Sequence, residues 1–272
     1  MEFLDFVLGP RLAVALESFG HVHSPVARWH GAAGVVGQGM SAATEPLNCA
    51  TCPVRERAAC AALSEDERTE LARIGRRRTV KKGETIFAAG EDAGACATLI
   101  SGALKIASYG EDGTERILSL VHPAGFVGEM FSPVAHHDVV ALADSELCLF
   151  NRDQYEAAVD RFPALAKALL RRSAEDLFDA RSLVELQARR TSKGRVAAFL
   201  LAMAEAASHS PCHAADAFDL PLTRGEIAGL LGLTIETVSR QLTALERDRV
   251  IGRDGARGIR VADAARLREL AQ

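Results

Sequence analysis

Apolar and polar residues follow each other in short runs between Arg76 and Asn151, and glycines separate these runs. Many short β-type runs with turn residues between them predict a small barrel or roll. Before it, Ser64 and Glu67 form a capping signature that predicts a helix over Glu65–Ile74. The runs that predict strands are Thr85–Ala88, Ala97–Ile100, Ala103–Ser108, Arg116–Leu120 and Ala141–Phe150.

The segment Leu222–Ile251 has the pattern of two short helices around a tight turn. Thr223 and Glu226 can cap the first helix reciprocally. Gly232 can end it, because glycine enters the left-handed region without steric cost. Thr234 is then placed to cap the second helix. The segment therefore predicts a helix-turn-helix.

The second of these helices has two chemically different faces. Its apolar residues predict a face in the core: Ile235, Val238, Leu242 and Leu245. Its polar residues form a face suited to base edges in a DNA major groove: Glu236, Ser239, Arg240 and Thr243. We assign Thr237 to the same surface and expect Arg224 and Thr243 to touch phosphates. The alternative interpretation is an ordinary solvated helix face.

A hairpin follows, with strands Val250–Arg253 and Gly258–Val261 around the turn Asp254-Gly255. It makes the unit a winged helix-turn-helix and places Arg253, Arg257 and Arg260 near the phosphates. From residue 188 to 272 there are 13 Lys and Arg against 10 Asp and Glu, a net charge of +3. The remainder has 19 against 26, so it is −7, and the two sum to −4. A basic end on an acidic body fits a DNA-binding module attached to a sensor.

From Arg152 the pattern is helical, and Pro163 can occupy a first turn. Beyond it, apolar and small residues recur at alternating steps of three and four, as in a heptad seam. We favour a dimer seam, because helix-turn-helix proteins bind paired half-sites as dimers. The alternative is a helix face packed on its own domain. The seam residues are Leu170, Ser173, Leu177, Ala180 and Val184.

Length and composition fit a globular protein that can bury two sizeable cores, with 272 residues of which 48% are hydrophobic. No apolar run reaches the roughly 18 residues of a membrane span, so no membrane partner is expected. The N-terminus lacks a basic signal-peptide region, which predicts the cytoplasm. The expected organisation is a poorly ordered leader (1–48, with a short helix near Leu12–Glu17), a cysteine segment (49–63), a β-roll sensor (64–151), a dimerisation helix (152–187) and a DNA-binding domain (188–272).

Three cysteines stand as Cys49-x2-Cys52-x7-Cys60. Such spacing lets thiolates hold one soft metal centre, an iron–sulfur cluster or zinc. Free thiols are the third possibility, since the other cysteines are isolated. The spacing alone leaves these alternatives open. The isolated cysteines are Cys96, Cys148 and Cys212.

The order of cysteine segment, roll, long helix and winged helix resembles the CRP/FNR family of bacterial transcription regulators. The resemblance covers about Asn48–Leu270. It rests on motifs in two parts of the chain. One is Gly125-Phe-Val-Gly-Glu129 in the roll. The other is Gly232-Leu-Thr-Ile-Glu-Thr-Val-Ser-Arg240 in the DNA-binding domain (188–272), which we call the reader. The fold class it implies is α+β, with an N-terminal β-roll like cyclic-nucleotide-binding domains, a long dimerisation helix and a C-terminal winged helix-turn-helix.

FNR-type members of this family hold an oxygen-labile 4Fe-4S cluster with an N-terminal cysteine trio and one cysteine in the last strand of the roll. The resemblance thus implies Cys49, Cys52, Cys60 and Cys148 as ligands, although the chain alone cannot choose Cys148 over Cys96. It also implies a homodimer on palindromic TTGAT-type double-stranded DNA, with RNA polymerase as a further partner. Glu236, Ser239 and Arg240 match the base-reading positions of the family. The expected function is oxygen-responsive regulation of anaerobic or microaerobic metabolism.

Three alternative functions compete with this interpretation. A relative without a cluster could bind a cyclic nucleotide through Gly128-Glu129, but no Arg or Lys between Ile117 and Asn151 could hold its phosphate. Haem could be bound by His122 or by His136-His137. An iron–sulfur oxidoreductase lacks support, because the sequence has no dinucleotide fingerprint or P-loop, so we expect no enzyme activity.

Overall fold

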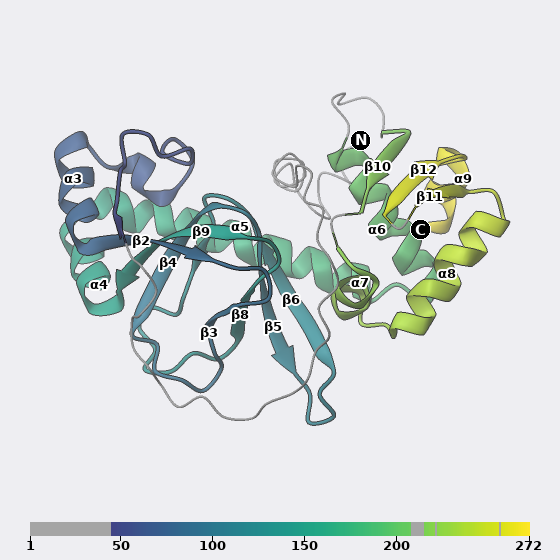
Figure 1. Cartoon of the computed structure of the whole chain (residues 1–272), viewed down its shortest axis with the longest axis horizontal. Coiled ribbons are helices and arrows are strands. Elements are labelled where there is room, and N and C mark those ends of the chain that lie inside the picture. The colour runs from purple at the N-terminus through teal and green to yellow at the C-terminus, as the bar shows by residue number, and fades with distance from the viewer. Residues whose placement is uncertain (1–44, 208–214, 221, 256) are drawn as a thin grey trace.

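A β-roll, a long helix and a winged helix follow one another along the chain (Figure 1). The structure is a computed structural model that describes residues 45–207, 215–220, 222–255 and 257–272. The expected leader falls outside this part of the chain except for 45–48, as do the helix near Leu12–Glu17 and Cys212.

The roll consists of two antiparallel sheets that face each other. One has the strand order β1-β2-β9-β4-β7 and the other β3-β8-β5-β6. Apolar side chains from both sheets, including Val80, Leu99, Leu104 and Leu147, fill the space between them. The strands are β1 (Glu45–Pro46), β2 (Gly75–Val80), β3 (Thr85–Phe87), β4 (Ala95–Ser101), β5 (Leu104–Tyr109), β6 (Glu115–Val121), β7 (Phe126–Val127), β8 (Asp138–Ala141) and β9 (Ser145–Asn151).

Helices cover part of the outer face of the five-stranded sheet, so this sheet packs on both of its sides. The 3-10 turn η1 (Ala59–Ala62), α3 (Glu65–Ile74), α4 (Arg152–Arg161) and α5 (Pro163–Gln187) lie against it. Leu63, Leu71, Phe150, Tyr155 and Leu165 form one buried cluster there. The capping box predicted for α3 is present, since Ser64 Oγ accepts from the Glu67 N–H at 3.3 Å and Glu67 Oε2 from the Ser64 N–H at 2.8 Å.

Two sequence expectations for the roll need correction. The run Ala141–Phe150 is not one strand: β8 ends at Ala141 in one sheet and β9 begins at Ser145 in the other. The chain crosses between the sheets at residues 142–144. The apolar run Ala141–Phe150 gives no sign of this crossing. Strand β2 was not predicted, because its three consecutive arginines lack the apolar pattern of a strand, although β2 pairs with β9.

The range 152–187 contains two helices rather than one. Phe162 leaves the helical region at φ −115° and ψ 89°, and Pro163 then begins α5 at its first position, as predicted. Figure 1 shows α5 running from the end of the roll that carries α3 and α4 to the winged helix. It therefore connects the cysteine segment with the reader.

The described part of the reader contains a three-stranded sheet, of order β10-β12-β11, beside four helices. Strand β10 was not foreseen, and the hairpin begins one residue later than expected. The elements are α6 (Ser192–Ala206), β10 (Ala217–Asp219), α7 (Arg224–Leu231), α8 (Ile235–Arg247), β11 (Ile251–Asp254), β12 (Gly258–Val261) and α9 (Ala264–Leu270).

The roll and the reader share one buried core. Ile117 of β6 and Leu142 join the same apolar cluster as Leu230 and Leu231 of α7. At the contact, Gly229 lies so close to β6 that an added Cβ would stand 3.2 Å from the Glu115 carbonyl oxygen. The two domains are therefore packed directly against each other along β6 and α7.

None of the described helices has an apolar stretch long enough to cross a membrane.

We expect Ile117→Ala to lower the free energy of unfolding by about 2–5 kcal/mol, because Ile117 is fully buried in the core that joins roll and reader. Urea denaturation would measure this change. Val134→Ala is the control, because this roll side chain is 42% exposed and its truncation should change stability by no more than about 0.5 kcal/mol. Equal effects of the two substitutions would contradict the shared core.

Candidate functional site

The cysteine trio lies on a tightly turned segment that leads into α3. The Cys52 N–H donates to the Cys49 carbonyl at 3.5 Å, and the Arg55 N–H donates to the Cys52 carbonyl at 3.1 Å. Cys60 lies in η1, whose neighbours Ala59 and Leu63 pack into the cluster beneath it. The three thiols are thus held on one folded segment over the sheet, residues 49–63, which we call the cysteine cap.

Alternation along β9 places Cys148 beneath this cap. Leu147 and Leu149 belong to the interior of the roll, so Cys148 and Phe150 face the opposite side, toward the helices. Cys96 shares that face on β4, where it pairs with Phe150. The strand face alone therefore does not separate Cys148 from Cys96.

A cavity does separate them. It lies between the cap and the outer face of the sheet, and Cys49, Cys52, Cys60 and Cys148 all line it, whereas Cys96 does not. Most other lining residues are apolar, among them Leu47, Val54, Leu71, Phe150 and Tyr155. The structure thus brings together the four cysteines that the resemblance implied as ligands.

The electrostatics of these thiols reflect their enclosure. Burial raises the pKa of Cys60 to about 11, and the nearby Cys49 and Cys52 add to the shift. Burial likewise raises the pKa of Cys148, with contributions from the three cysteines of the cap. Thiols this close repel one another as anions, so holding them as thiolates requires a cation or metal among them.

The donor set is of the type that binds soft metal centres. Within the described part of the chain, no group of three or more Cys, His, Asp or Glu side chains is gathered as tightly as one ion needs. Four thiols line one mostly apolar cavity, and thiolates are soft donors that bind zinc or iron–sulfur clusters.

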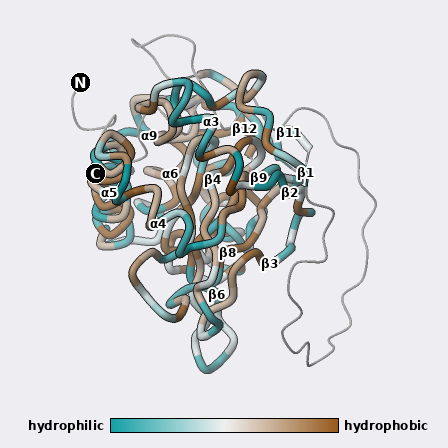
Figure 2. The backbone as a smooth tube through the Cα atoms, turned by 90° about the vertical axis from the view of Figure 1, so that its left-hand side faces the viewer, coloured by the Kyte–Doolittle hydropathy of each residue, from teal (hydrophilic) through white to brown (hydrophobic). Residues whose placement is uncertain are grey.

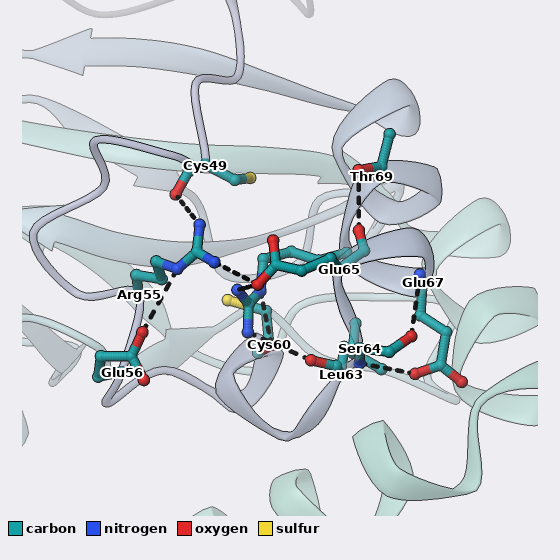
Figure 3. A network of polar contacts seen from close by, with 10 residues as sticks. Cys49, Arg55, Glu56, Cys60, Leu63, Ser64, Glu65, Glu67 and Thr69 are labelled. Carbon is teal, nitrogen blue, oxygen red and sulfur yellow. Dashed lines mark hydrogen bonds and ion pairs between the residues drawn. The ribbon is translucent and has the colours of Figure 1, made fainter.

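Two arginines that sequence reasoning missed also line the cavity. Arg55 belongs to the cysteine segment (Figure 3). Arg68 belongs to α3. Their spacing from the cysteines carried no recognisable motif, so only the folded cap reveals their position.

Glu129, which could bind the sugar of a cyclic nucleotide in the roll, already has hydrogen-bond partners within the protein. Glu129 accepts a hydrogen bond from the His136 N–H at 2.7 Å and contacts the His136 ring through its other oxygen. Burial opposes charge on Glu129, but the hydrogen bonds from His136 outweigh it and lower the pKa of that carboxyl. His136 and His137 both contact Glu129, so these contacts hold the two ends of the loop 129–137 together.

The reader helices have the predicted caps. Thr223 and Glu226 form the reciprocal pair at the start of α7, and Gly232 ends it at φ 61° and ψ 42°. Thr234 Oγ1 accepts from the Thr237 N–H at 3.2 Å at the start of α8. These contacts fix the turn between the two helices.

The polar face of α8 is accessible over its first three turns. Glu236, Arg240 and Thr243 are exposed, and Ser239 and Thr237 are half-buried. The N–H of Glu236 itself and the Thr234 hydroxyl lower the pKa of the Glu236 carboxyl, which keeps it an acceptor.

One expectation for the reader was wrong. Ile235 is 52% exposed and is not part of the core face, because it is the first residue of α8 and lies beyond the packed turns. Arg253 is half-buried, and its Nε donates to Glu246 Oε2 at 2.8 Å. Its place near the phosphates stays a prediction. Arg257 and Arg260 remain exposed, as does Arg224 at the start of α7.

Helix α5 presents an uncovered apolar stripe. Leu170, Leu177 and Val184 are 72%, 51% and 63% exposed, with Ser173 also exposed and Ala180 half-buried between them. The opposite side of α5 is buried through residues such as Leu165, Leu183 and Leu186. In Figure 2 α5 lies at the edge of the molecule, with hydrophobic and hydrophilic residues mixed along it. The structure thus rejects packing of this stripe on its own domain.

Comparison with known proteins identifies both domains. A family model for the cyclic nucleotide-binding domain matches residues 77–162, and one for the Crp-like helix-turn-helix domain matches residues 194–270.

Curated relatives match most of the chain. The transcriptional activator protein FnrL of Cereibacter sphaeroides is 36% identical over 228 residues, covering 81% of this chain and 90% of FnrL. The nitrogen fixation regulation protein FixK of Bradyrhizobium diazoefficiens is 31% identical, covering 82% and 93%. Among solved structures, FixK2 from Bradyrhizobium japonicum aligns with a TM-score of 0.62 at 28% identity, covering 73% of this chain and 98% of FixK2.

In metal-free native protein, we expect iodoacetamide to label Cys49 and to leave Cys96 unlabelled. Cys49 is partly exposed, whereas Cys96 is fully buried and burial raises its pKa to about 12, so almost no thiolate forms. Peptide mass spectrometry would measure the labelling, and the two thiols should react alike in denaturant. Equal labelling in the native protein would show that the sheet under α4 is open.

Proposed function

This chain belongs to the CRP/FNR family of transcription regulators, and we propose that it is an oxygen-responsive member of the FNR type. Its family membership makes it a DNA-binding regulator and not an enzyme. In the proposed function, Cys49, Cys52, Cys60 and Cys148 hold a 4Fe-4S cluster. The name of the relative FnrL, a transcriptional activator, agrees with an activating role.

One observation carries this proposal: four thiols from two distant segments line a single cavity. Three come from the cap and one from β9, so a centre bound there would join the cap to the roll. Oxygen would destroy such a cluster when it is bound. The connection between the cap and the roll would therefore depend on the oxygen level. The four cysteines would hold the cap on the roll while the cluster is bound and release it when the cluster is lost.

The packing around Cys60 supports a connection from this cavity to the dimer seam. Ala59 and Cys60 of η1 share a buried cluster with Leu165 and Leu169 of α5. A fixed cap therefore fixes the first turns of α5, and the same helix exposes Leu170, Leu177 and Val184 farther along. We propose that the stripe pairs with its copy in a homodimer when the cap is held. The acidic Glu175, Asp176 and Asp179 beside it keep that pairing marginal without the cap.

In the proposed dimer, two α8 helices read the half-sites of a palindromic TTGAT-type operator. Arg240 can donate two hydrogen bonds to a guanine, Glu236 can accept from a cytosine amine, and Ser239 leaves room for a thymine methyl group. Arg224 and Thr243 then contact phosphates. The proposed outcome is recruitment of RNA polymerase to genes of anaerobic or microaerobic metabolism.

A nucleotide-sensing role finds less support, although the roll matches a cyclic nucleotide-binding model. Glu129 is occupied by His136, and no Arg or Lys between Ile117 and Asn151 offers a cation for a phosphate. Burying a phosphate without such a partner is costly.

Anaerobic reconstitution should give iron and sulfide near four each per chain, in line with a 4Fe-4S centre. Cys148→Ala should lose the visible absorbance, whereas Cys96→Ala, the matched control on the same sheet face, should keep it because Cys96 lies outside the cavity. The measurements are iron and sulfide analysis and sedimentation before and after air, with a lighter species expected after air. Colourless wild-type protein that binds zinc would refute the proposal.

Arg240→Ala should weaken operator binding by about 1–3 kcal/mol and relax the base choice at one position of each half-site. Anaerobic binding titrations with wild-type and singly substituted operators would measure this. Arg247→Ala is the control, because Arg247 is at the far end of α8 and pairs with Asp248. Unchanged affinity of Arg240→Ala would show that α8 does not enter the groove as proposed.

A further inference from the structure

Arg68 is a buried guanidinium that holds the segment carrying Cys60. Only 6% of the residue is exposed. Its Nε donates to the Cys60 carbonyl at 3.2 Å and its Nη2 to the Leu63 carbonyl at 3.2 Å. Its Nη1 pairs with Glu65 Oε1 at 2.9 Å. Every nitrogen of this side chain is therefore committed to the cap.

Arg55 makes the equivalent contact with the first cysteine of the trio. Its Nη1 donates to the Cys49 carbonyl at 3.3 Å, and its Nη2 pairs with Glu65 Oε1 (Figure 3). The same carboxylate oxygen thus joins both guanidinium groups. Glu65 lies in the first turn of α3, where the helix dipole favours a negative charge.

The charges of this network do not cancel at the cavity. Arg55 and Arg68 both line it, whereas Glu65 does not and its side chain is 71% exposed. Glu56, which contacts Arg55 Nε at 3.3 Å, is 81% exposed and is also outside the lining. The side facing the four sulfurs therefore carries two cations, and the carboxylates lie on the side facing water.

We infer that Arg55 and Arg68, joined through Glu65, form a cationic clamp that positions the Cys49 and Cys60 backbone and balances the negative charge of a cluster held by four thiolates. This inference rests on the proposed function. Groups that orient ligands and neutralise their charge control how firmly a metal centre is held. A purely structural role for the two arginines would need their contacts with the backbone but not their charge.

The test compares how fast a chelator removes iron from anaerobically reconstituted protein, followed by the loss of visible absorbance. Arg55→Gln and Arg68→Met should lose iron about 10- to 100-fold faster than wild type. Arg57→Gln is the control, because Arg57 is an exposed cation of the same segment outside the cavity lining, and its rate should equal that of wild type.

Glu65→Gln separates charge from positioning. The amide oxygen can still accept hydrogen bonds from both arginines, but the negative charge is gone, so iron loss should be no faster than in wild type. Arg68→Lys keeps the charge but a single ammonium cannot reach all three partners of Arg68, so its rate should fall between wild type and Arg68→Met.

The outcomes distinguish the clamp from the proposed function. Wild-type protein that takes up no iron and sulfide would refute both. Wild-type protein with a cluster whose loss is unchanged in Arg55→Gln and Arg68→Met would refute the clamp alone, and faster loss in Glu65→Gln would refute its electrostatic part. Circular dichroism of the metal-free variants checks folding, and if Arg68→Met does not fold, the more exposed Arg55→Gln decides.

Discussion

The packing of the cysteine cap onto the outer face of the roll is the contact on which the rest of this structure depends. A sheet of this kind normally turns one face to water, yet here both faces are buried, one inside the roll and the other under η1, α3, α4 and α5. Because η1 and α5 share that second cluster, the position of Cys60 and the course of the long helix are determined together. The cysteine segment and the long helix are thus parts of one apolar layer.

The sequence predicted those parts of the fold whose signals are local. The Ser64 and Thr223 capping boxes, the left-handed Gly232 and the helix start at Pro163 depend on a few neighbouring residues, and the structure has each of them. Features set by distant packing were missed. Strand β2 is stabilised by pairing with β9 across the sheet, and nothing in its run of arginines indicates that partner.

The candidate site shows the same division. The spacing of Cys49, Cys52 and Cys60 was visible in the chain, but the choice between Cys96 and Cys148 required knowing which strand positions lie under the cap. Both cysteines face the helices, so alternation was insufficient, and only the outline of the cavity distinguishes them. The roles of Arg55 and Arg68 were equally hidden, since an arginine that binds backbone carbonyls leaves no motif.

The seam between β6 and α7 limits how such regulators can diversify. With Gly229 against the Glu115 carbonyl and Ile117 in the core that the two domains share, the two halves of this chain are not independent units. A transplanted sensor would have to bring a β6 surface that accommodates the recipient's α7. New signal specificities would therefore arise more easily by altering the cap and its cavity than by recombining whole domains.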